Sequence, residues 1–237
     1  MKGTILVTGG AGFIGSHVCE KLLKDGHKVI CLDNLDPYYD PQLKRRNLRV
    51  CLNNPNFKFI KMDIRDKKGL EQLFRNHDID RIVHLAAKVG VRPSVKDPFI
   101  YEEINVGGTL NLLELSRKYG IKNFVFASSS SVYGICNKVP FSEEDPVSPI
   151  SPYAASKRAA EIYCETYANL YGISVVCLRL FTVYGPRQRP DMAIHRFTKL
   201  IDEGKEVPVF GDGSSKRDYT YVDDVVEGII RALNRNF

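Results

Sequence analysis

The sequence contains no apolar run that approaches the roughly 20 residues needed to cross a bilayer, which excludes a membrane-spanning bundle. Its N-terminus is basic and then apolar, but Gly9 and Gly10 end this run before it reaches the length of a signal-peptide core. Internal repeats and low-complexity linkers are also absent. We therefore expect a soluble cytoplasmic protein.

Closely spaced cysteines and histidines are lacking as well. The six cysteines stand far apart, at positions 19, 31, 51, 136, 164 and 177, with no Cys-x-x-Cys motif. This spacing excludes the usual zinc motifs and favours reduced, mostly buried thiols. We expect no metal site.

Acidic residues are outnumbered, because 28 Asp and Glu face 34 Lys and Arg, for a net charge of +6. A basic balance is typical of proteins that bind nucleic acid, a membrane surface or a small anionic ligand. Here the positive charges are scattered, and the densest cluster, over residues 44–49, has the pattern of a solvated face. We expect neither nucleic acid nor a membrane as a partner.

What the sequence does contain is an alternation of short strands with helix-length segments. The expected strands are Thr4–Thr8, Lys28–Asp33, Phe57–Asp63, Arg81–Ala86, Asn123–Ser129, Ser174–Leu180 and Glu206–Phe210. The expected helices are Phe13–Lys24, Lys67–Asn76, Tyr101–Tyr119, Tyr153–Tyr171 and Asp223–Leu233. The first six strands are nearly all apolar, as strands buried on both faces of a parallel sheet are. The alternation predicts a doubly wound α/β fold.

Two stretches depart from this alternation. Residues 36–56 form a longer polar connection, and after Leu180 the sequence is interrupted by the loop signals Gly185-Pro186 and Arg189-Pro190. With 237 residues the chain has material for one large domain or two small ones. We therefore expect a main domain over residues 1–180 and a smaller region over 181–237.

A glycine-rich turn joins the first strand to the first helix. Gly9, Gly12 and Gly15 follow the apolar strand directly and open an amphipathic helix. Glycine permits a tight turn and lets a pyrophosphate and the helix approach the strand closely. The helix N-terminus then presents free N–H groups and a positive dipole to the phosphates. The turn therefore predicts a dinucleotide site.

Acidic residues at the ends of two strands indicate which dinucleotide this is. Asp33 stands about 20 residues after the glycines, where a carboxylate meets the ribose hydroxyls of adenosine. It repels a 2′-phosphate, and its neighbours Asn34 and Leu35 offer no compensating arginine, so we expect NAD rather than NADP. Asp63 ends the third expected strand, where a carboxylate can accept a hydrogen bond from the adenine amino group.

A tyrosine and a lysine stand one helical turn apart. Tyr153 and Lys157 share one face of an expected helix because they are spaced i, i+4. A phenol with a pKa of about 10 is a poor base near neutrality, and an ammonium about 5 Å away favours the phenolate by on the order of 3 kcal/mol. We therefore expect Tyr153 to act as a base, with Lys157 as its electrostatic partner and a ribose contact.

A run of serines leaves the fifth expected strand at the edge of the sheet where open α/β folds bind ligands. A hydroxyl of Ser128–Ser131 at this edge can hold a substrate oxygen and relay its proton. The alternative for any one serine is a hydrogen bond within a turn. For the run as a whole we favour a role in the site.

Together these residues resemble the extended short-chain dehydrogenase/reductase family, in particular its NAD-dependent sugar-nucleotide epimerases and dehydratases. The resemblance covers residues 4–233, with landmarks at Thr8–Gly15, Asp33-Asn34, His84–Ala87, Ser128–Gly134, Tyr153–Lys157 and Arg217-Asp218-Tyr219. It implies an NAD-binding Rossmann domain over 1–180 and a substrate-binding region over 181–237, whose last helix returns to the Rossmann domain. Family members usually continue well past Phe237, so we expect this region to be partial.

The resemblance also implies roles for individual residues. The active-site hydroxyl falls on Ser129, the base on Tyr153 and its lysine on Lys157. Further positions that line the cofactor are Phe13, Ile14, Asn34, Asp63, Ile64, Leu85, Ala86 and Ala87. Arg217 matches an arginine that binds the nucleotide pyrophosphate, and Arg92 and Arg187 are candidates for anchoring other charged parts of the substrate.

Within the family, the sequence is most similar to UDP-glucuronate 4-epimerases, through residues 33–41, 128–134 and 181–192. The implied reaction inverts C4 of a UDP-sugar through a 4-keto intermediate. UDP-glucuronate and UDP-galacturonate are favoured over UDP-glucose and UDP-galactose, since four hydroxyls can hold a C5 carboxylate. These hydroxyls belong to Ser128, Ser129, Ser130 and Thr182.

Alternatives stay open at this point. A related dehydratase is disfavoured because Ser130 and Ser131 stand where dTDP-glucose 4,6-dehydratases carry Asp-Glu. A decarboxylase, a reductase and a catalytically weak NAD-binding protein remain. Family members are commonly homodimers packed through helices, here those expected over 101–119 and 153–171.

Overall fold

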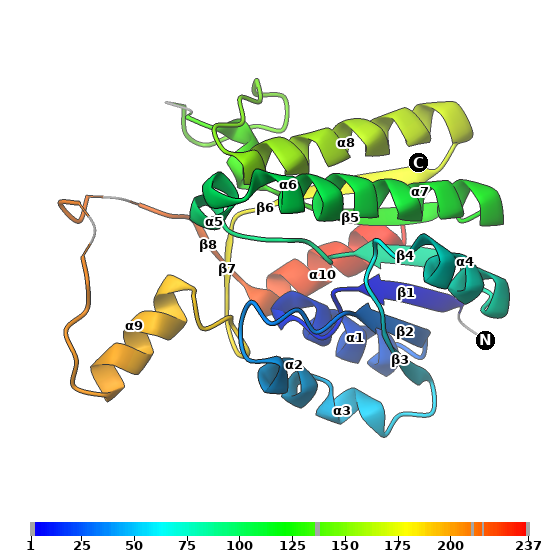
Figure 1. The fold of residues 1–237 in the computed structure, drawn as a ribbon, viewed down its shortest axis with the longest axis horizontal. Helices are drawn as coiled ribbons and strands as arrows, with labels where there is room; N and C mark the ends of the chain where they lie inside the picture. The colour runs from blue at the N-terminus through cyan, green and yellow to red at the C-terminus, as the bar shows by residue number, and fades with distance from the viewer. Residues whose placement is uncertain (1–2, 136–137, 210, 215, 236–237) are drawn as a thin grey trace.

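The computed structural model describes residues 3–135, 138–209, 211–214 and 216–235. Its centre is a six-stranded sheet in the order β3-β2-β1-β4-β5-β6, with every neighbouring pair parallel (Figure 1). The strands are β1 (Thr4–Thr8), β2 (Lys28–Asp33), β3 (Phe57–Lys61), β4 (Arg81–His84), β5 (Asn123–Ser129) and β6 (Ser174–Leu180). This is the Rossmann strand order, so the predicted fold class is confirmed.

Helices cover both faces of the sheet (Figure 1). On one face lie α1 (Phe13–Lys24) and α10 (Val222–Leu233), which pack against each other and against the sheet. On the other face lie α4 (Lys67–Asn76), α7 (Gly108–Tyr119) and α8 (Pro152–Tyr171). The last helix of the chain therefore belongs to the same core as the first one, while the division of the chain at residue 181 stays a prediction.

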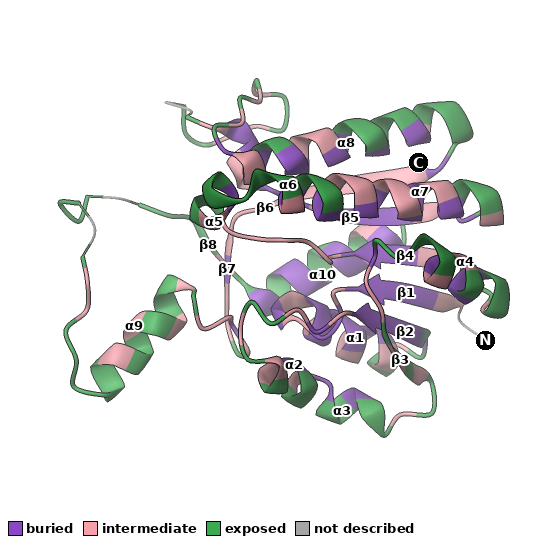
Figure 2. Cartoon of the chain, in the orientation of Figure 1, coloured by how far each residue is buried: buried purple, intermediate pink, exposed green. Residues whose placement is uncertain are grey.

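The two layers explain why the strands are apolar at consecutive positions. In β1, Ile5 and Val7 pack under α1, while Leu6 between them packs in the opposite layer. Side chains alternate between the faces of a strand, so a strand covered on both sides needs apolar residues throughout. Figure 2 shows this burial in the mostly purple strands β1, β2, β4 and β5, whereas the edge strand β6 is pink.

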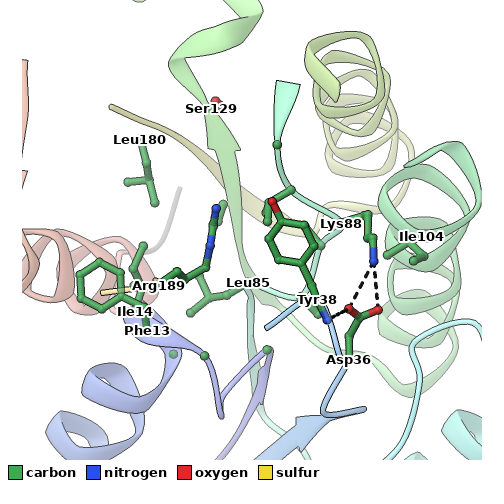
Figure 3. Close-up of a pocket in the computed structure, with 18 of the residues that line it drawn as sticks. Phe13, Ile14, Asp36, Tyr38, Leu85, Lys88, Ile104, Ser129, Leu180 and Arg189 are labelled. Atoms are coloured by element: carbon green, nitrogen blue, oxygen red, sulfur yellow. Dashed lines mark hydrogen bonds and ion pairs between the residues drawn. The ribbon is translucent and has the colours of Figure 1, made fainter. Parts of the chain in front are cut away.

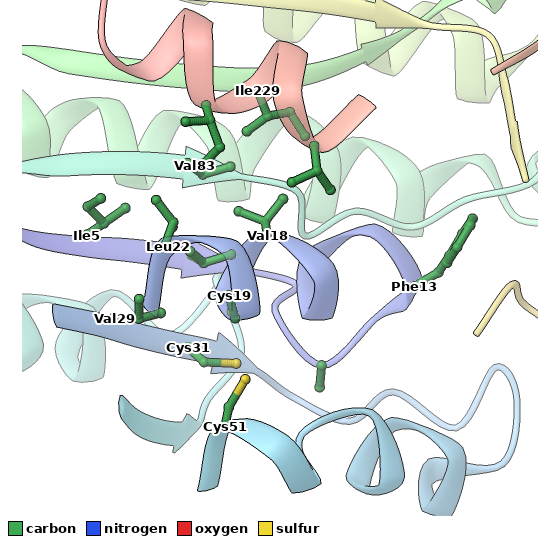
Figure 4. Packing of buried hydrophobic residues seen from close by; sticks show 14 of the residues in the cluster. Ile5, Phe13, Val18, Cys19, Leu22, Val29, Cys31, Cys51, Val83 and Ile229 are labelled. Atoms are coloured by element: carbon green, nitrogen blue, oxygen red, sulfur yellow. The ribbon is translucent and has the colours of Figure 1, made fainter. Parts of the chain in front are cut away.

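The cysteines pack as small apolar side chains. Cys19 on α1, Cys31 on β2 and Cys51 on α3 belong to one core cluster, and the sulfurs of Cys31 and Cys51 are directed toward each other (Figure 4). The five cysteines within the described residues are free thiols, and only Cys177 among them is not fully buried. This agrees with the reduced thiols expected from their spacing, while Cys136 lies outside the described residues.

Two strands end earlier than the sequence pattern indicates. β3 ends at Lys61 rather than Asp63, and β4 ends at His84 rather than Ala86. The residues that follow therefore lie in loops beyond the carboxyl edge of the sheet, where they face the site described below.

The connection after β2 is not a plain loop. It contains α2 (Pro41–Asn47) and α3 (Arg49–Leu52). The Asp40 side chain caps α2 by accepting a hydrogen bond from the amide of Gln42 at 2.8 Å, and Pro41 occupies the first turn. An Asp-Pro pair is a helix-start signal, which the polar composition of the segment concealed.

The expected helix over 101–119 is not one α-helix, because its first part is π-helical and α7 begins only at Gly108. Short helices α5 (Val91–Lys96) and α6 (Pro98–Tyr101) lead into a π-helical segment, η1 (Glu102–Gly107), before α7 begins. The Asn105 side chain within this segment donates to the Lys88 carbonyl at 3.0 Å and accepts from the Lys88 amide at 2.7 Å. The segment thus fixes the loop that follows β4.

After β6 the structure differs most from the prediction. β7 (Thr182–Tyr184) pairs in parallel with β8 (Tyr219–Tyr221), and α9 (Ala193–Asp202) extends away from the sheet with none of its residues buried (Figures 1 and 2). The predicted strand Glu206–Phe210 is wrong over residues 206–209, which pair with no other strand, and Phe210 lies outside the described residues. An apolar run forms a strand only where a neighbour supplies hydrogen bonds. Within the described part of the chain, no helix has the length and hydropathy needed to cross a membrane.

Candidate active site

A pocket of about 480 Å³ opens at the carboxyl edge of the sheet, where β1, β2, β4 and β5 end (Figure 3). Every residue predicted to bind the cofactor lines it: Gly9, Gly12, Phe13, Ile14, Gly15, Asp33, Asn34, Asp63, Ile64, Leu85, Ala86, Ala87, Tyr153 and Lys157. The other lining residues with predicted roles are Ser128, Ser129, Ser130 and Thr182. The fold thus brings these residues together, while their individual roles remain predictions.

The glycine turn is as tight as the sequence requires. Gly9 adopts a left-handed conformation, with φ of +69°, and its carbonyl accepts from the Gly12 amide at 3.1 Å. A Cβ atom at Gly15 would lie 2.2 Å from the Gly9 carbonyl oxygen, so α1 begins in direct contact with the turn. Among the described residues, no side chain caps the N-terminus of α1, which leaves its amide groups for an anionic group.

Asp33 is held at the end of β2 by main-chain donors. Its carboxylate accepts from the amides of Ala11 at 3.1 Å and Leu35 at 2.8 Å. Burial raises its pKa, whereas the Lys44 ammonium, 3.9 Å away, and these two amides lower it. The neighbours of Asp33 in the sequence offer no arginine, and in the folded chain Lys44 reaches the carboxylate from α2. One carboxylate and one ammonium beside the glycine turn fit the ribose hydroxyls and phosphate of a dinucleotide.

Asp63 already has partners of its own. It accepts a paired hydrogen bond from Arg65, at 3.0 Å to each oxygen, and another from the Asn34 amide at 2.9 Å. Burial raises its pKa, but these donors outweigh burial, and the net effect is a lowered pKa. The carboxylate is therefore ionised and fixed in orientation at the edge of the pocket.

The phenol of Tyr153 faces the pocket from the first turn of α8. Burial raises its pKa, and this effect outweighs the lowering by a hydrogen bond with Ser129 and by the charge of Arg189. Lys157 is not among the groups that shift the Tyr153 pKa here, so its expected role as electrostatic partner of the phenol stays a prediction. The cation that acts on the phenol is Arg189, a residue that the sequence argument did not select.

Lys157 is directed into the end of β5. Its ammonium donates to the Ala127 carbonyl at 2.7 Å and lies 4.8 Å from the centre of the Phe126 ring. Burial lowers its pKa to about 8, against the opposing effects of Cys164, Glu161 and Cys177. Lys157 thus holds the strand that carries the serine run.

Hydrogen bonds constrain two of the serines. Ser128 donates to the buried Glu161 carboxylate at 2.5 Å, so its single proton is already engaged. Ser129 accepts from the Ser131 amide at 3.2 Å, where the short 3-10 segment η2 (Ser130–Tyr133) begins. Ser128 can therefore accept from a ligand but not donate to one, which corrects its expected role as a donor to a carboxylate.

The structure separates the arginines that the sequence argument grouped together. Arg187 turns toward α1, with its guanidinium 2.7 Å from Glu20 and 3.2 Å from the Ser16 hydroxyl. Arg92 on α5 and Arg217 before β8 are exposed, and neither they nor Arg187 line the pocket. The expected role of these three residues in anchoring the substrate therefore stays a prediction.

Arg189, rather than the three predicted arginines, lines the pocket. It forms a paired hydrogen bond with Asp191, at 2.9 and 2.7 Å, and its guanidinium lies 5.9 Å from the Tyr38 ring (Figure 3). The Tyr38 hydroxyl donates to the same Asp191 carboxylate at 3.3 Å. The positive φ of Arg187, +67°, reverses the chain just before this segment, and this turn decides which arginine points inward. An Arg-x-Asp pair is visible in the sequence, but its direction is not.

Lys88 and Asp36 complete the polar wall opposite the serines. The Lys88 ammonium lies 3.2 Å from both Asp36 oxygens and 5.5 Å from the Tyr38 ring centre. Lys88 and Asp36 were not predicted from the sequence, because they follow two different strands, β4 and β2. Among the described residues, no three His, Cys, Asp or Glu side chains are grouped so that they could hold a metal ion.

Comparison with known proteins identifies the family. Residues 5–237 match the model of the NAD dependent epimerase/dehydratase family. The chain belongs to this family. The family is NAD dependent, as the glycine turn and Asp33 indicated.

Individual relatives are similar over nearly the whole chain. A UDP-glucuronate 4-epimerase of Thermodesulfobacterium geofontis is 47% identical over 232 residues, which is 98% of this chain and 72% of the relative. The crystal structure of the Bacillus cereus UDP-glucuronic acid 4-epimerase, in complex with UDP-glucuronic acid and NAD, superposes with a TM-score of 0.90 at 42% identity and covers 99% of this chain and 74% of that one. A Thermotoga maritima UDP-glucose 4-epimerase with UDP-glucose gives 0.89 at 42%, covering 98% and 73%.

The contact between Gly9 and Gly15 provides a test of the cofactor site. Gly15→Ala should lower NAD affinity by at least about tenfold, because the added methyl group forces α1 away from the turn that receives the pyrophosphate. Equilibrium dialysis with NAD measures this. Gly228→Ala is the matched control, since a Cβ there meets no atom within 4 Å. Unchanged affinity in a Gly15→Ala protein with native circular dichroism would show that the close approach is not needed.

Proposed function

We propose that this protein catalyses the NAD-dependent inversion of C4 in a UDP-sugar, with UDP-glucuronate and UDP-galacturonate as the favoured substrates. One observation carries the proposal: the glycine turn, the Tyr153 phenol and the Arg189 guanidinium face the same pocket. Membership of the epimerase/dehydratase family supports the reaction class. The two crystal structures named above, of a UDP-glucuronic acid 4-epimerase and a UDP-glucose 4-epimerase, are both 42% identical to this chain, so the substrate preference is argued from the pocket itself.

The residues at the first two strand ends hold the cofactor in this proposal. The turn at Gly9–Gly15 and the amides of α1 receive the pyrophosphate, and Asp33 accepts from the ribose hydroxyls. NAD, when bound, supplies the hydride acceptor and donor that inversion at a carbinol carbon requires. The remaining steps belong to side chains of this chain.

Tyr153 moves the proton. Its phenolate takes the proton of the C4 hydroxyl as the carbinol becomes a ketone, and its phenol returns a proton to oxygen after the keto sugar has turned its other face. Burial raises the Tyr153 pKa, and Arg189 and Ser129 oppose this effect, so these two residues favour the basic form. Ser129 also places a hydroxyl where it can hold the reacting oxygen.

Arg189 favours a substrate with a carboxylate. Only 22% of its side chain is exposed, and among the described residues its ion-pair partner is Asp191. A substrate carboxylate can accept from the same guanidinium, and the hydroxyls of Ser130 and Thr182, which line the same pocket, supply further donors. Holding the carboxylate in polar contacts also protects a 4-keto uronate from loss of CO₂. This argument places a uronate ahead of a neutral hexose.

The first prediction concerns the base. Tyr153→Phe should lower kcat for epimerisation by about 1,000-fold or more, because the proton acceptor is removed while the ring remains. Proton NMR of the products from a panel of UDP-sugars measures turnover, and NAD content is measured on the same samples. Tyr163→Phe is the control, because Tyr163 lies on the exposed side of α8. Undiminished conversion by Tyr153→Phe would refute the mechanism.

A second prediction separates the two arginines near the pocket. Arg189→Gln should reduce kcat/KM for both UDP-glucuronate and UDP-glucose, because Arg189 favours the phenolate of Tyr153. The reduction should be about 100-fold greater for UDP-glucuronate, since only the uronate also loses a charge pair with the guanidinium. Arg187→Gln should leave kcat/KM for both substrates unchanged, because Arg187 pairs with Glu20. A greater loss of uronate preference in Arg187→Gln would restore the assignment made from the sequence.

We also propose that the protein is a homodimer packed through α7 and α8, which lie side by side on one face (Figure 1). On α8, Leu170 is 66% exposed and Ile162 is 50% exposed, and grouped exposed apolar side chains are typical of an interface.

Sedimentation should therefore give the mass of two chains, and Leu170→Glu should reduce it to one. Leu52→Glu is the control, since Leu52 is exposed on α3 instead. A single-chain mass for the unaltered protein would exclude the dimer.

A further inference from the structure

A third ionisable residue shares the face of α8 that carries the proposed base. Glu161 follows Lys157 at the spacing by which Lys157 follows Tyr153, so all three point toward the sheet. Glu161 is only 3% exposed and does not line the pocket. The proposed reaction gives it no role, although a carboxylate is rarely buried without a partner.

The Glu161 carboxylate is fully engaged by cations and one hydroxyl. Arg179 on β6 donates to both of its oxygens, at 3.1 Å each, and Arg158 donates to Oε2 at 2.9 Å. Oε1 also accepts from Ser128 at 2.5 Å. Ser128 and Arg179 are direct partners in the β5–β6 register, so the strand pairing itself delivers both groups to the carboxylate.

This arrangement fixes the direction of the Ser128 hydroxyl. A serine hydroxyl has one proton and two lone pairs, and the proton is directed to Glu161. The lone pairs remain for the pocket that Ser128 lines. Ser128 can therefore accept a hydrogen bond from a sugar hydroxyl. Its neighbour Ser129 forms a hydrogen bond with Tyr153 in the same pocket.

The same carboxylate acts on the buried ammonium of Lys157. The ionisable groups that bear on Lys157 are Glu161 and Cys164 on α8, Cys177 on β6 and His84 on β4. His84 is bound by two threonine hydroxyls, and burial lowers its pKa to about 3, so it is neutral in the working range. A hydrogen bond with Cys177 and burial raise the pKa of the Cys164 thiol, which leaves Glu161, one helical turn from Lys157 on α8, as the anion that acts on the ammonium.

We propose that Glu161 is a positioning residue that orients Ser128 as a hydrogen-bond acceptor and keeps Lys157 protonated at the end of β5. The first part rests on the proposed function, because it concerns the substrate pocket. The second part is a property of the folded chain and needs no substrate. Arg179 and Arg158 in turn hold Glu161 ionised, because their hydrogen bonds outweigh the burial that raises its pKa.

The charge on Lys157 is tested without any turnover. In protein labelled with ¹³C at lysine Cε, the Lys157 signal is assigned by its loss in Lys157→Met and followed against pH. Glu161→Gln should move its titration down by about one pH unit, since removal of the anion leaves the charges of Arg158 and Arg179 uncompensated. Glu165→Gln removes the same charge from the exposed side of α8 and should not move it. A titration unmoved in folded Glu161→Gln protein would overturn this part of the proposal.

The orientation of Ser128 is tested by combining variants of the NAD-loaded protein. Ser128→Ala and Glu161→Gln should each lower kcat by about tenfold, because a glutamine has one acceptor oxygen and cannot serve Ser128 and the Arg179 fork together. Ser128→Ala should cost nothing further in the Glu161→Gln background. Independent, multiplicative losses would overturn the positioning role. If Glu161→Gln folds poorly, an undiminished kcat in Ser128→Ala alone would overturn the role given to the Ser128 hydroxyl.

The two proposals can fail separately. An unaltered protein that converts no UDP-sugar, but whose Lys157 titration moves in Glu161→Gln, would refute the proposed function alone. Conversion that proceeds normally, together with an unmoved titration and multiplicative losses, would refute the role of Glu161 alone.

Discussion

Parallel pairing brings the carboxyl ends of all six strands to one edge of the sheet, and every part of the pocket depends on this constraint. The glycine turn follows β1, Asp33 ends β2 and Ser129 ends β5. A parallel sheet must have both faces covered, so the chain returns through a helix after each strand. The N-terminus of α1 and the first turn of α8 consequently reach the same edge, the first with free amides and the second with a phenol.

Burial, rather than proximity between side chains, sets the electrostatics of this site. Tyr153 and Lys157 are both shifted toward their neutral forms by loss of water. Charges that the structure places around them work against this shift, with Arg189 acting on the phenol and Glu161 on the ammonium. A buried ion is retained only where such partners compensate its desolvation. The site thus consists of a few reactive groups supported by a larger set of fixed charges.

Local patterns predicted the central part of the fold well. The strands at 4–8, 28–33, 123–129 and 174–180 and the helices at 13–24 and 67–76 have the bounds expected from the sequence. These elements are long, strongly periodic and bounded by glycine or polar residues. The largest errors lie after Leu180, where β7 and β8 are three residues each and pair across a long separation. No local signal distinguishes such a pair from a loop, because each strand exists only through the other.

The glycine turn, the preference for NAD and the Tyr153–Lys157 face could be identified from the chain alone, since each depends on residues close together in sequence. The choice of Arg189 over Arg187, the approach of Lys44 to Asp33 and the hydrogen bond of Ser128 to Glu161 required the folded molecule. Each of these contacts joins different elements, and its direction depends on a backbone turn or a strand register. Short-range spacing carries no information about either, because both arise only when the sheet and its covering helices have packed.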